Sequence, residues 1–199
     1  MTAPPLLPNL ALPLTTRRLL IRDYTTADTP AVQDNVRDSS YWEHHATEPP
    51  TPEQISALIL WAVQEQSIKP RVNYYLAAVR KDGKDAGLVI GEAVLRITDP
   101  INRQGEIGFG VARKYWKQGF ATEMGQALLT AAFGHFKLHR VLAQCAPDNK
   151  ASIRVMQKLG LAREGMFRDL TFARGKWWSN VIYAILEHEH AKIAKVTQG

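Results

Sequence analysis

The spacing of apolar residues divides the chain into short strands and helices. Alternating apolar and polar positions, rich in β-branched and aromatic residues, are typical of strands. We expect seven strands, at residues 16–24, twice within 73–99 around a turn at Asp82–Gly83, and at 105–113, 140–146, 162–173 and 177–186. Apolar residues three and four positions apart predict four helices, at about 25–37, 52–66, 120–136 and 149–160.

These elements follow one another in the order β α α β β β α β α β β. Strands and helices alternate between residues 105 and 161, which favours parallel pairing there, whereas the hairpins favour antiparallel pairing elsewhere. We therefore expect one α/β domain (an α+β mixed sheet) at residues 15–186, with a central sheet of about seven strands flanked by about four helices.

The two ends of the chain lie outside this predicted domain. Four prolines interrupt residues 1–14 and no basic residue precedes the apolar part, so we expect a loose, extended N-terminal arm rather than a signal peptide. Residues 187–199 are expected to form a C-terminal tail. Its Glu-His-Glu-His run and the pair His44–His45 are interpreted as solvated polar segments, so no metal site is expected.

Composition narrows the class of protein without identifying it. A length of 199 residues suits one domain, and no run approaches the ~18 apolar residues of a membrane span, so we expect no membrane contact. The single cysteine, Cys145, excludes an intramolecular disulfide and fits a reducing cytoplasm. The formal charge of +6 permits nucleic acid, acidic lipid or a phosphorylated cofactor as partner, but the basic residues are scattered and form no nucleic-acid motif.

The segment GEIGFGV has one packed face and one bare face. Phe109 and Val111 share the apolar face, while Glu106, Gly108 and Gly110 share the other. Glycine weakens a strand interior unless a ligand or another backbone approaches closely. This pattern predicts a ligand lying along the strand.

The helix that follows begins without a capping side chain. No Ser, Asp or Asn precedes its first turn, so its free N–H groups and dipole favour a phosphate or diphosphate there. The loop entering the helix contains Lys117, Gln118, Gly119, Phe120, Ala121 and Thr122. An ordinary strand-to-helix turn that needs Gly119 only for its φ angle is the alternative, and spacing does not separate the two.

The run EIGFGVARKYWKQGFATEMGQALL and its continuation through PDNKAS resemble the cofactor-binding core of the GNAT N-acetyltransferases, and more narrowly the RimJ/RimL-like branch. The likeness covers roughly residues 15–186 and is strongest over 106–169. The family signature is Gln or Arg, two residues, Gly, one residue, then Gly or Ala. Here Trp116 replaces the Gln or Arg, and Lys117 takes a place often held by Gly.

The resemblance implies acetyl-CoA as donor and no metal. Its diphosphate would lie on the amides of residues 118–122, with Lys117 adding charge, and its pantetheine would pair with the backbone of residues 109–111. Asn149 would contact the pantetheine arm, and Ser152 would lie near the thioester sulfur. Asn149 has the alternative role of helix N-cap, and Ser152 that of a small first-turn residue.

Acetyl transfer requires a neutral amine, donors for the oxyanion and a proton for the thiolate. The resemblance makes Glu106 the candidate base, acting through water, and Ser152 the candidate acid. A polar residue on a wet strand face is the alternative for Glu106. The amine itself is expected to be a protein N-terminus, such as that of a ribosomal protein, because its pKa of about 7.7 to 8.0 leaves more neutral amine than lysine's ~10.4.

The acceptor site is expected between the loop that carries Tyr41 and Trp42 and the turn at Trp177–Trp178, whose aromatic rings can wall a groove. Covering the core is the alternative for these rings. Other acceptors remain open, namely an amino acid, a polyamine or an antibiotic, as does a non-catalytic module that binds acyl-CoA. The sequence allows a monomer or a homodimer.

Overall fold

The computed structural model describes residues 7–197, and side chains as far as residue 193. In this part of the chain the strands form one sheet in the order β1-β2-β3-β4-β5-β6-β8-β7. The strands are β1 (Leu14–Thr15), β2 (Leu19–Asp23), β3 (Asn73–Arg80), β4 (Val89–Asp99), β5 (Gln104–Val111), β6 (Arg140–Cys145), β7 (Ala162–Ala173) and β8 (Lys176–Leu186). The pairing is antiparallel except between β5 and β6, which confirms the predicted mixed sheet.

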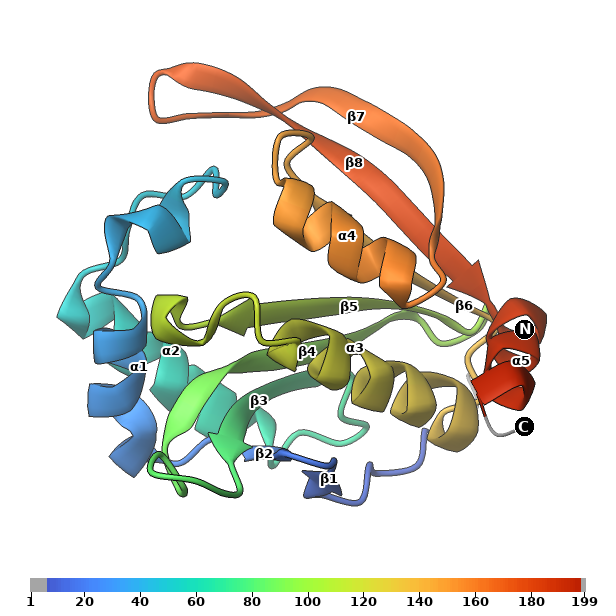
Figure 1. Ribbon diagram of the computed structural model, residues 1–199, viewed down its shortest axis with the longest axis horizontal. Coiled ribbons are helices and arrows are strands. Elements are labelled where there is room, and N and C mark those ends of the chain that lie inside the picture. The colour runs from blue at the N-terminus through green and yellow to red at the C-terminus, as the bar shows by residue number, and fades with distance from the viewer. Residues whose placement is uncertain (1–6, 198–199) are drawn as a thin grey trace.

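Helices cover both faces of this sheet (Figure 1). They are α1 (Thr29–Asn35), α2 (Pro52–Glu65), α3 (Phe120–Thr130), α4 (Lys150–Lys158) and α5 (Glu187–Thr197). A π-helical turn at Ala131–His135 extends α3, and a 3₁₀ turn at Ser39–Trp42 follows α1. None of the described helices is long and apolar enough to cross a membrane.

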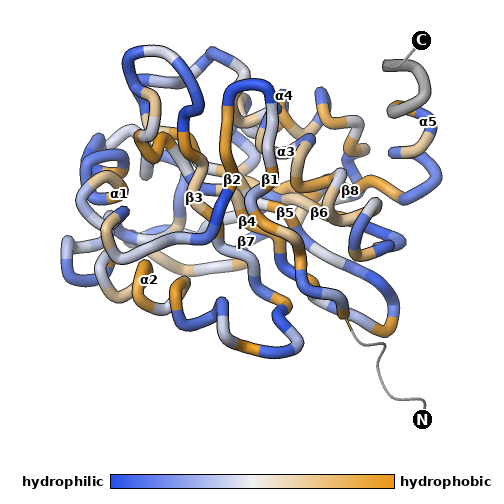
Figure 2. The backbone as a smooth tube through the Cα atoms, turned by 90° about the horizontal axis from the view of Figure 1, so that it is seen from below, coloured by the Kyte–Doolittle hydropathy of each residue, from blue (hydrophilic) through white to orange (hydrophobic). Residues whose placement is uncertain are grey.

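Two hydrophobic clusters hold the layers together. The larger joins the inner strands to α3 and α4 and includes Ile107, Met124 and Leu128. The smaller joins β3 to α1 and α2 and includes Tyr24 and Ile59. Figure 2 shows hydrophobic residues along the central strands and hydrophilic residues in the surrounding loops. The central sheet is therefore packed on both faces, and a polar residue on an inner strand needs a specific reason.

The ends of the chain are more ordered than the sequence predicted. Residues 1–6 of the arm and 198–199 of the tail lie outside the described residues, but Leu10 is buried in the larger cluster, and its N–H donates to the Tyr74 hydroxyl at 3.3 Å. The leucines between the prolines supply the apolar surface that docks this segment. Residues 187–197 form α5. Glu189 in its first turn accepts a hydrogen bond from the N–H of Leu186 at 2.9 Å, so this backbone donor at the start of the helix has a partner.

Candidate active site

Strand β5 loses its neighbour on one side partway along its length. It pairs with β6 only through residues 104–106, opposite residues 140–142. Beyond Glu106, β5 continues against β4 to Val111, whereas β6 continues against β8 to Cys145. The two central strands therefore separate in mid-sheet, with α3 following one and α4 the other (Figure 1).

The edge left by this separation carries unpaired backbone groups. The N–H of Ala112 bonds to the carbonyl of Ile90 on β4 at 2.9 Å. Because an antiparallel strand directs alternate residues toward its partner, Gly110 also faces β4, while Phe109 and Val111 direct their N–H and C=O groups toward the gap. An extended chain that contains amides can pair with this edge as an added strand would.

The first turn of α3 has no capping side chain, as the sequence predicted. Gly119 is the N-cap residue, with a φ of 84°. The N–H of Glu123 bonds to the Gly119 carbonyl at 3.0 Å, so the N–H groups of residues 120–122 have no acceptor within the helix. These amides and the positive end of the helix dipole fit a diphosphate, and the left-handed φ favours glycine at position 119.

Arg18 holds the loop before α3 without using its amides. Its Nη1 donates to the carbonyl of Gln118 at 3.0 Å, and its Nε donates to Glu123 at 2.7 Å. The guanidinium also lies 4.1 Å from the centroid of the buried Phe120 ring. Both hydrogen-bond partners of Arg18 are acceptors, so the loop is fixed while its N–H groups remain for a ligand. Lys117, exposed beside them, has a φ of 59°.

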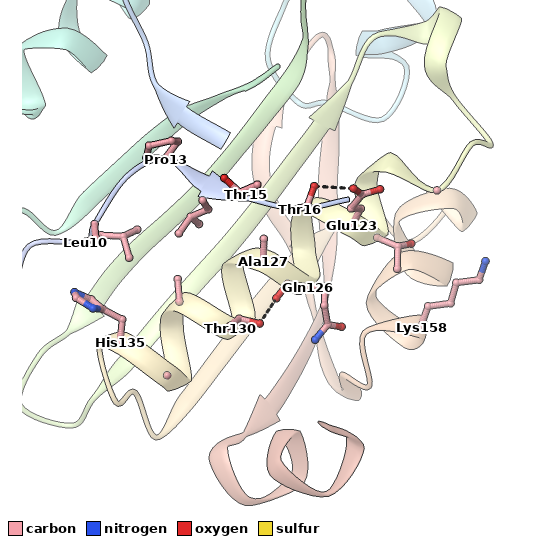
Figure 3. Close-up of a pocket in the computed structure, with 16 residues that line it drawn as sticks. Leu10, Pro13, Thr15, Thr16, Glu123, Gln126, Ala127, Thr130, His135 and Lys158 are labelled. Carbon is pink, nitrogen blue, oxygen red and sulfur yellow. Dashed lines mark hydrogen bonds between the residues drawn. The ribbon is translucent and has the colours of Figure 1, made fainter. Parts of the chain in front are cut away.

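A groove of about 1000 Å³ begins at this turn and continues along α3. Figure 3 shows it between α3 and the segment that contains β1, with Thr16 bonded to Glu123 at one end and His135 at the other. Lys158 of α4 stands at its rim. A ligand held by the amides of α3 therefore has room to extend beyond them.

Trp116 contacts the open strand edge directly. Its indole N–H donates to the carbonyl of Val111 at 2.6 Å, and the Arg113 guanidinium lies 5.3 Å from its ring centroid. The side chain therefore closes the end of β5. A ligand that pairs with this edge has the N–H of Val111 and both backbone groups of Phe109 available.

Asn149 is the N-cap of α4. Its Oδ1 accepts a hydrogen bond from the N–H of Ser152 at 3.0 Å, the role that the sequence left as its alternative. Ser152 is partly buried in the first turn of the helix. The neighbouring Asp148 lies 3.3 Å from Nδ1 of His44, so this turn meets the loop after α1.

The glycine face of β5 ends in a hydrogen-bonded carboxylate. Oε1 of Glu106 accepts from Gln144 at 3.0 Å, and Oε2 lies 3.5 Å from Nη1 of Arg96. Gln144 accepts in turn from Asn180 at 3.0 Å. The alternation predicted from the sequence places Glu106 on the same face as Gly110, on the part of β5 that is still paired with β6.

A second carboxylate, which the sequence analysis did not identify, lies at the other end of this face. Glu92 on β4 pairs in register with Gly110, and its carboxylate accepts hydrogen bonds from the hydroxyls of Tyr75 and, at 3.3 Å, Tyr41. A Cβ built on Gly110 would lie 2.2 Å from the Tyr41 hydroxyl and 2.9 Å from Oε1 of Glu92. Only glycine at position 110 leaves room for this cluster.

The environment of Glu92 disfavours its charge. Burial raises the pKa of the Glu92 carboxyl, and the hydrogen bonds from Tyr75 and Tyr41 oppose that rise. Burial and the nearby carboxylate together hold the pKa of both hydroxyls well above the ordinary tyrosine value. The tyrosines therefore remain protonated donors at neutral pH.

The loop after α1 and the β7–β8 turn meet at this end of the sheet (Figure 1). Nη1 of Arg174 donates to the carbonyls of Trp42 and His45 at 2.9 and 3.1 Å. Tyr41 reaches Glu92, whereas the Trp42 indole donates to the Val36 carbonyl at 2.8 Å and helps to fold its own loop.

The two tryptophans of the β7–β8 hairpin also differ, since one is buried and the other is exposed. Trp178 is buried, and its indole donates to the Ala173 carbonyl at 2.9 Å. Trp177 is 58% exposed and packs on Phe172, with ring centroids 5.3 Å apart. Of the expected acceptor residues, Tyr41 thus lies on the glycine face, while Trp177 presents its ring to solvent.

Two other chemistries receive no support from the described residues. Burial raises the pKa of the Cys145 thiol to about 11, so it is protonated at neutral pH and is no nucleophile. No group of three or more His, Cys, Asp or Glu in the described part of the chain is placed to hold a metal ion.

Comparisons with known proteins agree on one family. The protein-family model for the acetyltransferase (GNAT) domain matches residues 18–162. The uncharacterized N-acetyltransferase YnaD of Bacillus subtilis (strain 168) is 32% identical over 176 residues, which cover 88% of this chain and 98% of that protein. A crystal structure of a GNAT-family acetyltransferase from Bacillus anthracis has a TM-score of 0.74 at 30% identity, over 88% of this chain and 98% of the other.

A more distant structure shares the fold. RimL, a ribosomal L7/L12 α-N-protein acetyltransferase in complex with coenzyme A, has a TM-score of 0.73 at 18% identity, over 86% of this chain and 95% of its own.

Proposed function

The chain belongs to the GNAT acetyltransferase family, and from this premise we propose that it transfers the acetyl group of acetyl-CoA to the N-terminal α-amino group of a protein. That it is an N-acetyltransferase follows from the family. Acetyl-CoA as its own donor, the acceptor, and the residues that act on them are the proposal.

One observation carries the cofactor half of this proposal. The open edge of β5 at Phe109–Val111 and the uncapped turn of α3 at residues 119–122 are joined by a single short loop. Amides of the pantetheine arm can pair with the first, and the diphosphate can bind the second. We assign the adenosine end to the groove along α3 that Lys158 borders.

Further contacts with the donor are assigned to loop and helix residues. Residues 118–122 would hold the diphosphate through backbone N–H groups, and Lys117 would add positive charge. Asn149 would contact the pantetheine arm through the amide NH₂ that its capping bond does not use. In this assignment most contacts with the donor come from backbone N–H groups, so binding would depend on backbone geometry more than on particular side chains.

The chemical step would be a direct attack. The amine nitrogen forms a bond to the thioester carbonyl carbon, and the C–S bond breaks. Glu106 would take one amine proton through water, and Ser152 would relay a proton from solvent to the thiolate and so end the step as a hydroxyl. The N–H of Val111 would stabilise the oxyanion. Thioester chemistry of this kind requires no protein nucleophile, in agreement with the protonated Cys145 thiol.

The choice of acceptor rests on a shared fold and on the acidity of amines. RimL acts on a protein α-amino group by its description, and its fold is shared, which favours the RimJ/RimL-like branch. An α-amino group also has the larger neutral fraction at pH 7. The single cysteine favours a reducing cytoplasm, where newly made protein N-termini are present.

The proposal is tested by incubating the protein with acetyl-CoA and three kinds of acceptor: N-terminal peptides, lysine peptides and small amines. Release of free CoA and the masses of the products identify what is acetylated. Acetylated peptide N-termini are expected. Acetylation of a small amine alone would overturn the choice of acceptor, and Glu106→Gln with unchanged turnover at every pH would remove Glu106 from the mechanism.

A further inference from the structure

Glu92 is a charged residue on an inner strand of a sheet that is packed on both faces. Its oxygens accept bonds from Tyr41 and Tyr75, and no Arg or Lys among the described residues forms an ion pair with it. Ionising a partly buried carboxylate without a compensating cation is costly. A cation bound beside this cluster would stabilise the ionised form of Glu92, which burial alone disfavours.

The position of this charge is next to the proposed reaction site. Glu92 lies opposite Gly110, and Gly110 stands between Phe109 and Val111, whose backbone groups face the gap where β5 and β6 separate. The bare backbone of Gly110 is all that separates the carboxylate from this edge, since a Cβ there would overlap it. A group bound at Glu92 is thus within one residue of the open strand edge.

The two carboxylates occupy opposite ends of the glycine face. Glu106 precedes Gly110 by four residues, roughly 13 Å along a strand at ~3.3 Å per residue. Glu106 already has an Arg96 guanidinium at 3.5 Å and a donor in Gln144, whereas Glu92 has only neutral hydroxyl donors. The end at Glu92 is therefore the one that attracts a positive charge.

Aromatic rings complete the surroundings of Glu92. Tyr24 stacks on Tyr75 with centroids 5.6 Å apart, and Tyr41 packs edge to face on Trp42 at 5.1 Å. Ring faces attract cations, and carboxylate oxygens accept N–H donors. An ammonium group satisfies both, while a carboxylate or phosphate would be repelled.

We propose that Glu92, presented by Tyr41 and Tyr75, binds the ammonium form of the acceptor amine beside Gly110, before the amine loses its proton. This inference rests on the proposed function and adds a substrate-binding residue to it. Glu92 selects and positions the cationic amine. Its proton would then pass to Glu106 through a chain of waters along the bare face above Gly108, because the two carboxylates lie roughly 13 Å apart.

The test compares Glu92→Gln with the wild type on three probes: the peptide Ala-Ser-Gly-Gly-Trp amide, an acetyl-capped peptide with one lysine, and spermidine. For the best acceptor, Glu92→Gln is expected to raise KM by ~10- to 100-fold, the range for losing one charged hydrogen bond. The value of kcat is expected to change much less. The Kd for acetyl-CoA, measured by calorimetry, is expected to stay the same.

Three matched variants separate binding from structure. Tyr75→Phe keeps the carboxylate but removes one donor, so a smaller rise in KM is expected. Glu106→Gln is expected to lower kcat more than it raises KM. Glu164→Gln makes the same chemical change on β7, where the carboxylate is paired with Arg140, and is expected to leave both constants as in the wild type.

The outcomes distinguish this inference from the proposed function. If the wild type acetylates none of the probes, the proposed function fails and the inference falls with it. If the wild type is active and Glu92→Gln retains its KM, the inference alone is overturned. A lowered melting temperature of Glu92→Gln with an unchanged KM would assign Glu92 a structural role, which also overturns it.

Discussion

The two proposed sites beside strand β5 are formed by different kinds of chemical group. On the side of α3, the proposed donor site consists of backbone groups: the strand edge at Phe109–Val111 and the amides of residues 120–122. On the glycine face, the proposed acceptor site consists of side chains, with Glu92 and Tyr75 from neighbouring strands and Tyr41 from a distant loop. One side depends on main-chain conformation and the other on which side chains meet.

This difference determines how each side can fail. A backbone site tolerates side-chain changes but not changes of φ, because its donors are the same in every residue. A site made of side chains tolerates small changes in the conformation of the nearby main chain. It does not tolerate the loss of a charged group or an added methyl group that displaces its side chains. The following experiments test whether the two sides are as independent as their construction implies.

The largest effect is expected from Gly119→Val. A β-branched residue is strained at a φ of 84°, so the turn must rearrange and its amides no longer converge. We expect acetyl-CoA to bind at least ~100-fold more weakly, which corresponds to about 2.7 kcal/mol, while the KM of the amine changes little. Calorimetry with acetyl-CoA and steady-state kinetics measure the two quantities.

Gly87→Val is the matched control for this change. Gly87 has the same φ of 84°, and a Cβ there meets nothing within 4 Å, so the backbone strain is similar but lies outside the site. It should lose stability without losing acetyl-CoA affinity. Equal losses for donor and acceptor in Gly119→Val would contradict a separate backbone site.

Gly110→Ala should disrupt the proposed acceptor site on the glycine face. Its methyl group would overlap the Tyr41 hydroxyl and Oε1 of Glu92, so the cluster must shift. We expect kcat/KM for the amine to fall by ~10-fold or more, about 1.4 kcal/mol, with a smaller change in the Kd for acetyl-CoA. Gly165→Ala, where a Cβ meets nothing within 4 Å, is the control. A donor Kd that rises as much as the acceptor loss would show that the two sides are coupled.

The donor side was open to prediction because its signals are local. An uncapped helix start at Gly119 and the alternation around Gly110 each occupy a few consecutive residues. Alternation and turn chemistry also predicted seven of the eight strands in the described part of the chain, and missed only β1, which is two residues long. The backbone conformation at Lys117 is also a local feature. Its φ of 59° explains why glycine is common at this place in similar proteins.

On the acceptor side the sequence predicted Tyr41 but not its partner Glu92, because the two are far apart in the sequence. Tyr41 and Glu92 are separated by 51 residues, and Arg174 reaches Trp42 across 132 residues. The one local signal was a glutamate within the apolar run VIGEAVLRI. Its partly buried position opposite Gly110 depends on the register of β4 against β5. The arm at Leu10 was missed for a similar reason, because its burial depends on contacts made by the folded sheet.

The electrostatics of Glu92 give a third prediction, which concerns stability. Its carboxyl pKa is raised in the folded protein, so its stabilising contribution is fully present below the unfolded value of about 4.3 and is lost as pH rises through the folded value. At pH 7 to 8, Glu92→Gln should therefore melt at a higher temperature than the wild type. The difference should disappear near pH 4.

Glu164→Gln supplies a control of opposite sign. A hydrogen bond from Arg140 lowers the pKa of Glu164, so its contribution is present at neutral pH and is lost as pH falls through the folded value. This variant should melt below the wild type at pH 7. Melting curves between pH 4 and 8 compare all three proteins. A Glu92→Gln variant that is less stable at pH 8 would mean that the Glu92 charge is compensated in the folded protein. The acceptor site would then have no uncompensated charge to distinguish it from the donor site.

The smallest effect is expected from Trp116→Phe, at the position where the family signature has Gln or Arg. If the donor site is made of backbone, the Kd for acetyl-CoA should stay within ~3-fold of the wild type, or about 0.7 kcal/mol. The indole bond to the Val111 carbonyl is lost, so stability should fall by ~1 kcal/mol, or roughly 2–4 °C in melting temperature. Trp178→Phe removes the same kind of bond, to Ala173, far from the donor site. A loss of affinity above ~10-fold in Trp116→Phe alone would make residue 116 a side-chain contact of the cofactor, and the donor side would then depend on side chains as the acceptor side does.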